Sequence, residues 1–144
     1  MLVHQILKSK TGQDVVSIEP GSKVSDAASI LSERKIGTVV VSKDGKKADG
    51  ILSERDIVRE LGKRGPSCMS DKVDDLMTRD IITCAPGDQV DAILQKMTEG
   101  RFRHMPVLDD GKMIGVVSIG DVVKAQLAEL AMEKEALQGM IMGH

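Results

Sequence analysis

The pattern of hydrophobic and polar residues changes along the chain between helical spacing and short apolar runs. The same order of these two patterns occurs twice. Two stretches carry apolar side chains three and four positions apart, which is typical of one buried face of a helix. Each is followed by a short apolar run, TVVV at 38–41 and MPVL at 105–108, with the length and composition of a strand. An Asp-Gly pair after each run indicates a hairpin turn. The helical stripes consist of Val24, Ala27, Ala28 and Leu31 in the first stretch and of Val90, Ile93, Leu94 and Met97 in the second.

The second half of the chain repeats the first. Pro20-Gly21 aligns with Pro86-Gly87 at an offset of 66 residues, and the two strand runs align at about the same offset. After a gap of one residue, GILSERDIVRE from Gly50 aligns with GVVSIGDVVKA from Gly115. The lead-in segments VHQIL and VDDLM also match. This duplication predicts two copies of one unit, each with a lead-in helix followed by strand, helix, strand, turn, strand and helix.

These units divide the chain into four expected ranges. The first repeat, with its lead-in helix, occupies 1–61, and the second occupies 72–126. Between them, 62–71 is rich in Gly, Pro and Ser and has no periodic pattern, which is typical of a linker. The range 127–144 is predicted as an amphipathic helical extension, because apolar residues recur about every 3.5 positions there. Such a helix needs a partner face, which its own domain or a second copy of the chain could supply.

Composition excludes several classes of function. A net charge of −2 over 144 residues gives no broad basic field for nucleic acid, and the lack of Trp and Tyr removes stacking platforms for its bases. No apolar run approaches the roughly 20 residues of a membrane span, and the N-terminal sequence does not resemble a secretory signal. The two cysteines form no CxxC pair. We expect a cytoplasmic, reduced protein without nucleic-acid or membrane partners.

The polar residues give no sign of catalysis. His4, His104 and His144 are too far apart in sequence to suggest a metal site. No catalytic triad stands out, and Cys84 falls within an expected strand, where it would be a small buried residue. We therefore expect no enzyme, no metal site and no catalytic cofactor.

Each repeat contains the motif G-x-x-S-x-x-D where its last strand meets its last helix. The spacing fits a capping box, which needs no ligand. The same geometry also suits a nucleotide, because a helix N-terminus binds phosphate and a carboxylate one turn later can accept both hydroxyls of a ribose. The sequence of the motif leaves both interpretations open. Its residues are Gly50, Ser53 and Asp56 in the first repeat and Gly115, Ser118 and Asp121 in the second.

Several features together resemble the paired cystathionine-β-synthase (CBS) domain, or Bateman module. They are the duplicated unit, the lead-in helices, SERDIVR at 53–59, the HMPV turn at 104–107 and both G-x-x-S-x-x-D junctions. The resemblance covers nearly the whole chain except the C-terminal helix. It implies an α+β fold of two β-α-β-β-α repeats related by a pseudo-two-fold axis, to which the long C-terminal helix is added. It also implies clefts between the repeats for adenosine-containing ligands, such as AMP, ATP, ADP, S-adenosylmethionine or NAD(H), and pairing into a homodimer.

The resemblance assigns residues to each cleft. The motif aspartates would hold the ribose, the motif serines would lie beside the phosphate, and the two apolar strands of the repeat would enclose the base. Nearby cationic side chains are added as candidate phosphate contacts. The repeat 1 cleft is expected to use Val16, Ser17, Thr38, Val39, Ser53, Arg55 and Asp56. The repeat 2 cleft is expected to use Ile82, Thr83, Arg101, Arg103, His104, Met105, Pro106, Ser118 and Asp121.

The two repeats carry different charged residues at aligned positions of the expected clefts. Arg103 aligns with Gly37, whereas Arg55 aligns with Gly120. A hydrogen bond to a charged group is worth about 1.5–3 kcal/mol, so one arginine changes affinity roughly tenfold to a hundredfold. The Arg101 and Arg103 pair fits either a solvated turn or a phosphate clamp. We expect two non-equivalent clefts.

The predicted function is a regulatory module that senses adenine nucleotides through a change in packing between the repeats. Its output would be an effector protein or the dimer itself. The alternative is a ligand-independent, dimeric scaffold protein whose clefts are vestigial.

Overall fold

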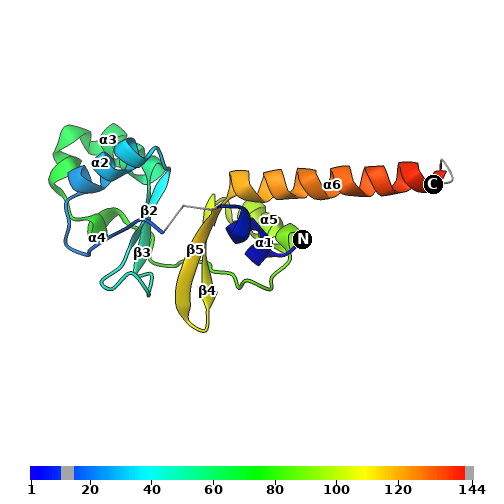
Figure 1. Ribbon diagram of the computed structural model, residues 1–144. Coiled ribbons are helices and arrows are strands. Elements are labelled where there is room, and N and C mark those ends of the chain that lie inside the picture. The colour runs from blue at the N-terminus through cyan, green and yellow to red at the C-terminus, as the bar shows by residue number, and fades with distance from the viewer. Residues whose placement is uncertain (11–14, 142–144) are drawn as a thin grey trace.

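The chain folds into two halves that lie side by side, and one long helix projects from the second half (Figure 1). The computed structural model describes residues 1–10 and 15–141. In chain order the elements are α1 (Val3–Ser9), β1 (Ser17–Ile18), α2 (Val24–Arg34), β2 (Thr38–Val41), β3 (Gly50–Ser53), α3 (Glu54–Arg64), the 3₁₀ helix η1 (Gly65–Ser70), α4 (Val73–Leu76), α5 (Val90–Gly100), β4 (His104–Asp109), β5 (Lys112–Ser118) and α6 (Ile119–Ile141).

Each half is built around a small sheet. In the first half the strand order is β1-β2-β3, with β1 parallel and β3 antiparallel to β2. In the second half β4 and β5 form an antiparallel pair. The strand expected before α5 is reduced to one parallel bridge between Cys84 and Val107. In the first half the Val40 N–H donates to the carbonyl of Val16, whereas the aligned residue of the second half is Pro106, which has no N–H to donate. The expected α+β fold of two repeats with a long C-terminal helix is confirmed.

The predicted helical stripes form two separate cores, one in each half. Full burial of a Val, Leu, Ile or Met side chain contributes about 1.5–3 kcal/mol, so each stripe fixes its helix on the neighbouring sheet. Ala28 and Leu94 lie at the margins of these cores and are partly buried. The buried stripe residues are Val24, Ala27 and Leu31 on α2 and Val90, Ile93 and Met97 on α5.

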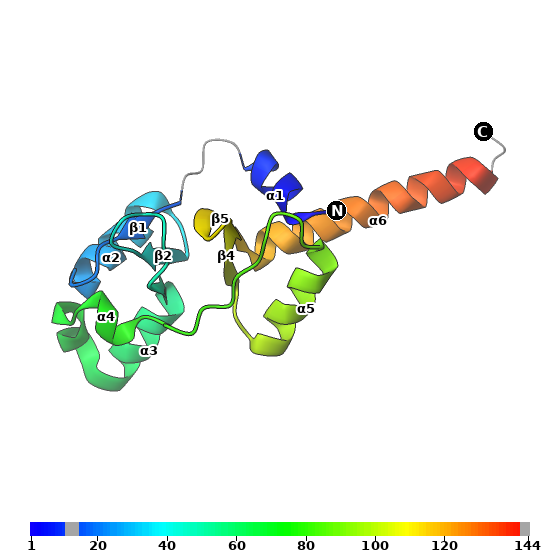
Figure 2. The ribbon, with the colours of Figure 1, turned by 90° about the horizontal axis from the view of Figure 1, so that it is seen from below.

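The lead-in helices are exchanged between the halves. Helix α1 packs in the core of the second half through Val3 and Ile6, and the Val3 N–H donates to the carbonyl of Asp88 at 3.0 Å. Helix α4 packs in the first core through Val73, whose N–H donates to the carbonyl of Ser22 at 2.8 Å. Figure 2 shows α1 beside the base of α6 and away from β1. Each packed half therefore contains the lead-in helix of the other repeat.

The segment expected to be an irregular linker, 62–71, has regular structure. Helix α3 continues to Arg64, and η1 follows it directly. Pro66 lies in the first turn of η1, where its missing N–H costs nothing. Cys68 is fully buried, so this segment is part of the first half rather than a loose connection.

Helix α6 begins on the body of the protein and then leaves it. Val122 and Ala125 are buried against the second core, and the N-terminal ammonium group pairs with Glu129 at 3.0 Å. From Leu127 onward the large apolar side chains of α6 are exposed, for example Leu127 at 62% and Ile141 at 84%. Residues 142–144 of the predicted extension, including His144, lie outside the described residues. In the part of the chain that the structure describes, no helix is long and apolar enough to cross a membrane.

Candidate functional site

Two clefts lie where the halves meet. The first cleft, defined by Asp56, has a volume of about 590 Å³. The second cleft, defined by Asp121, has a volume of about 510 Å³. Both volumes fall in the range of about 300–1,000 Å³ that is usual for small-molecule sites. Each cleft takes side chains from both halves, so an occupant would contact the two halves at once.

In the first cleft the motif forms a complete capping box at the start of α3. Ser53 Oγ accepts a hydrogen bond from the Asp56 N–H at 3.2 Å. Asp56 Oδ2 accepts from both the N–H and the hydroxyl of Ser53, each at 2.9 Å. Arg59 lies 3.5 Å from Asp56 Oδ1. The capping interpretation is confirmed in the first cleft. The cap occupies Asp56 Oδ2, whereas Oδ1 keeps lone pairs that can accept from another donor.

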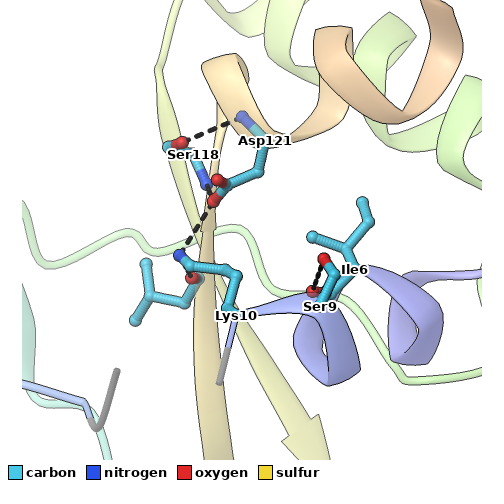
Figure 3. Close-up of polar contacts among 6 residues, drawn as sticks. Ile6, Ser9, Lys10, Ser118 and Asp121 are labelled. Atoms are coloured by element: carbon cyan, nitrogen blue, oxygen red, sulfur yellow. Dashed lines mark hydrogen bonds and ion pairs between the residues drawn. The ribbon is translucent and has the colours of Figure 1, made fainter. Parts of the chain in front are cut away.

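In the second cleft a lysine joins the cap. Asp121 Oδ2 accepts from the Ser118 N–H at 2.9 Å and from Lys10 Nζ at 2.8 Å, and Figure 3 shows Lys10 reaching from the end of α1 to this carboxylate. Lys10 Nζ also donates to the carbonyl of Val116 at 3.0 Å. Burial acts to raise the pKa of Asp121, but the hydrogen bonds from Lys10 and Ser118 outweigh it and leave the pKa below its usual value. Asp121 is therefore an ion-paired carboxylate at neutral pH.

The structure regroups the predicted site residues across the repeats. Arg101, Arg103 and Ile82 line the first cleft together with Asp56, whereas Val16 lines the second cleft together with Asp121. The expected grouping within each repeat is therefore wrong. Its physical reason is the packing of the two halves against each other, which places the cap of one half opposite the turn of the other.

Not every predicted residue reaches a cleft. Of the set, Thr38, Ser53, Arg55, Asp56, Ile82, Arg101, Arg103, His104 and Ser118 line the first cleft, and Val16, Thr38, His104, Ser118 and Asp121 line the second. Ser17, Val39, Thr83, Met105 and Pro106 line neither. Val39 and Met105 are fully buried in the cores, because successive side chains of a strand point to opposite faces.

His104 lies at the junction of the two clefts and lines both. Its ring is within 3.6 Å of the position that a Cβ would occupy on Gly37, at the start of the first half's β2. Burial lowers the pKa of His104, and the ammonium of Lys10 lowers it further, against the opposing effect of Asp121 and Glu54. His104 is thus mostly neutral at pH 7, so the positive charge near it comes from side chains such as Arg101 and Arg103.

Both clefts collect cationic side chains although the chain as a whole is acidic. Among the described residues, the second cleft is lined by the cations Lys10, Arg34 and Lys35 and by the carboxylate of Asp121. The cations of the first cleft are Arg55, Arg59, Arg101 and Arg103, which accompany Glu54, Asp56 and Asp80. Such concentrations of positive charge beside a helix N-terminus favour an anionic ligand.

Among the charged residues of the clefts, sequence reasoning missed Lys10, Arg34, Lys35, Glu54, Arg59 and Asp80. A signal for two of them was present in the matched lead-in segments, because extending the alignment of Val3 with Val73 places Lys10 opposite Asp80. The structure confirms this equivalence, since Lys10 lines the second cleft and Asp80 lines the first. The same position therefore carries opposite charges in the two clefts.

Cys84 is a buried residue of the second half. Cys84 is 5% exposed, and burial raises its pKa to about 11, with a smaller contribution from Asp88. Its thiol is therefore protonated at neutral pH, as expected of a structural cysteine. Within residues 1–10 and 15–141, no group of three His, Cys, Asp or Glu side chains could hold a metal ion.

The fold and the clefts define a tandem-repeat protein in which each half contributes a Ser-Asp helix cap to the lining of the clefts. Its sequence matches the CBS domain at residues 6–63 and 73–128. The chain belongs to the CBS domain family and carries the domain twice.

Known proteins resemble this chain over most of its length. It is 41% identical over 124 residues to the CBS domain-containing protein CBSX3, mitochondrial, of Arabidopsis thaliana, which covers 83% of this chain but only 60% of that protein. The CBS-domain containing protein ATU1752 from Agrobacterium tumefaciens superposes with a TM-score of 0.83 at 38% identity, over 88% of this chain and 99% of that one. The CBS domain protein PAE2072 from Pyrobaculum aerophilum, whose structure is a complex with AMP, superposes with a TM-score of 0.77 at 25% identity, over 92% and 99%.

Proposed function

We propose that this protein is a regulatory module that binds adenosine-containing nucleotides in two non-equivalent clefts. The observation that carries the proposal is the pairing, in each cleft, of a Ser-Asp helix cap from one half with cationic and apolar side chains from the other. The complex of the Pyrobaculum relative with AMP supports the ligand class. AMP, ADP, ATP, NAD(H) and S-adenosylmethionine are the candidates, and no catalytic step is assigned.

The first cleft would hold such a ligand through three kinds of contact. Asp56 would accept the ribose hydroxyls at Oδ1, since Oδ2 is engaged in the cap. The N-terminus of α3 and the guanidinium groups of Arg101 and Arg103 would bind phosphate. Ile82 is 46% exposed at the cleft and would form an apolar wall for the base.

The second cleft would use the same plan with different side chains. Asp121 would take the ribose, and Val16 would contact the base. Lys10, already bound to Asp121, would supply the positive charge beside the phosphate. Because a ligand in either cleft touches both halves, binding would shift the packing between them, and this shift would be passed to an effector protein or to a second copy.

A scaffold protein whose clefts bind nothing is the second candidate. The observation that favours it is the exposed apolar side of α6, which is a protein-binding feature independent of the clefts.

Thermal unfolding with each nucleotide separates the two candidates. A ligand at 100 times its dissociation constant adds about 2.7 kcal/mol, which raises the midpoint by several degrees for a domain of this size. Detection needs an added dye or calorimetry, since the chain has no Trp or Tyr. An unchanged midpoint with all five ligands would reject the sensing function and leave the scaffold.

A further inference from the structure

The outer part of α6 has apolar side chains that nothing in the described structure covers. Leu127, Leu130, Leu137 and Ile141 are between 54% and 84% exposed, and Figure 2 shows this part of α6 extending beyond the body. Only the first turns of α6 are packed on the body, through Val122 and Ala125. Because most helical stability in proteins comes from packing of an apolar face, a partner that covers this side would stabilise the outer part of α6.

The spacing of these residues indicates what kind of partner fits. Their separations alternate between four and three, which is the heptad repeat of a coiled coil rather than the broader stripe of a helix lying on a globular surface. One position in the series is polar, Lys134. We call the whole series the α6 seam: Val123, Leu127, Leu130, Lys134, Leu137 and Ile141.

We propose that the α6 seam pairs antiparallel with the α6 seam of a second copy of this chain. In an antiparallel coiled coil an a residue packs against a d residue of the partner helix. With the two-fold axis near Met132, Val123 of one copy meets Ile141 of the other, and Leu127 meets Leu137. Leu130 then meets Lys134, so all six seam positions find an occupant on the second copy.

The charge of Lys134 selects this orientation. In a parallel pair in register, Lys134 would face its own copy in the interior of the coiled coil, and two ammonium groups side by side repel. In the antiparallel pair the Lys134 stem lies along Leu130, and its ammonium can reach Glu133 of the second copy at the surface. A single lysine at an a position is a known device for fixing register and orientation, at some cost in stability.

Disulfide trapping tests both the partner and the orientation. Chains carrying Leu127→Cys are mixed with chains carrying Leu137→Cys under mild oxidation. The proposal expects crosslinking between the two kinds of chain and little within either kind alone. The unsubstituted chain is the control for Cys68 and Cys84, which are both buried. Crosslinking within each kind alone would overturn the antiparallel arrangement, and no crosslinking in any mixture would overturn the pairing.

Sedimentation equilibrium gives an independent test. The double variant Leu130→Glu, Leu137→Glu should shift the dimer to monomer, whereas Met132→Glu should remain a dimer. Met132 is a matched control because it is 59% exposed on the opposite side of the same helix. Circular dichroism and AMP titration of each variant verify that the two halves stay folded, and they also report on the clefts separately from assembly. A monomeric unsubstituted chain, or a double variant that stays dimeric, would overturn the proposal.

Discussion

The two clefts share a backbone plan but differ in the residue that reaches the motif aspartate. In the first cleft the Ser53 hydroxyl donates to Asp56. In the second cleft the ammonium of Lys10 takes the corresponding acceptor, so the Ser118 hydroxyl proton is left for another partner. The position equivalent to Lys10 in the first cleft is Asp80, which has the opposite charge. Duplication has therefore preserved the helix caps, while the exchanged lead-in segments make the clefts electrostatically different.

The largest effect is expected from the motif aspartates. Asp56→Asn and Asp121→Asn each keep one oxygen for the serine N–H of the cap but remove the charged acceptor for the ribose. Loss of hydrogen bonds to a charged group, at about 1.5–3 kcal/mol each, should weaken adenosine binding in that cleft by about 100-fold or more. Isothermal titration calorimetry should then show one site instead of two. Asp91→Asn, on the exposed side of α5, is the control, and unchanged stoichiometry in both cleft variants would contradict the ribose assignment.

Arg103 should contribute to the binding of ligands that carry a phosphate, and only in the first cleft. Arg103→Ala is expected to weaken AMP in the first cleft by roughly tenfold to a hundredfold, because one charge-assisted hydrogen bond is lost. Adenosine, which has no phosphate, should bind almost as before. Lys112→Ala, in the hairpin away from both clefts, serves as the comparison. Equal losses for AMP and adenosine would place Arg103 in a structural role.

Lys10 and Asp80 occupy equivalent positions with opposite charges, and each charge can be neutralised in a separate variant. Lys10→Met should lower the affinity of the second cleft for AMP several-fold, and Asp80→Asn should raise that of the first cleft by a similar factor, since partly exposed charges are worth about 1 kcal/mol or less. Titration of each variant in the background of the aspartate substitution that silences the other cleft measures this directly. Effects of the same sign in both clefts would show that this position does not set the difference.

Lys10→Met should also change acid stability. The lowered pKa of Asp121 gives stability that is present above the unfolded-state pKa, near 3.9, and is lost as the pH falls through the lower folded-state value. Without Lys10 the folded-state pKa of Asp121 rises toward its unfolded-state value, so Lys10→Met should lose less stability on acidification than the unsubstituted chain. Urea unfolding between pH 3 and pH 6 would reveal this weaker pH dependence, and superimposable pH profiles would argue against the ion pair.

The smallest effect concerns His104, between the clefts. Because its folded-state pKa is lowered, the unfolded chain takes up a proton first as the pH falls below about 6.5, and the folded state loses stability in that window. His104→Gln should abolish this loss of stability when unfolding is compared at pH 7 and pH 5.5. A phosphate in either cleft should oppose the effect by favouring protonated His104. Identical pH dependence in the variant would mean that His104 does not titrate differently on folding.

Local sequence signals predicted much of this architecture, but they did not predict which lead-in helix packs in which half. The stripe of Val90, Ile93 and Met97 and the Ser53-x-x-Asp56 cap follow from periodicity and hydrogen-bonding chemistry within a few residues. Neither signal tells a lead-in helix which of two similar halves it will join. That choice depends on packing across the whole chain, so the exchange of α1 and α4 was missed, and with it the assignment of Arg101 and Arg103 to the first cleft. Lys10 was missed for the same reason, since its partner Asp121 is distant in sequence.

The exchanged lead-in helices also determine the order in which the protein can be completed during synthesis. Helix α1 is made well before α5, but its binding site includes Val90 and Ile93 of α5. At about 5–20 residues per second, α1 must wait roughly 4–17 s on the ribosome for that site to appear. Neither half can finish its core from its own repeat, so a gene cut between the repeats would yield two fragments that each expose an apolar groove. A helix that is made before the first repeat thus completes the core of the second.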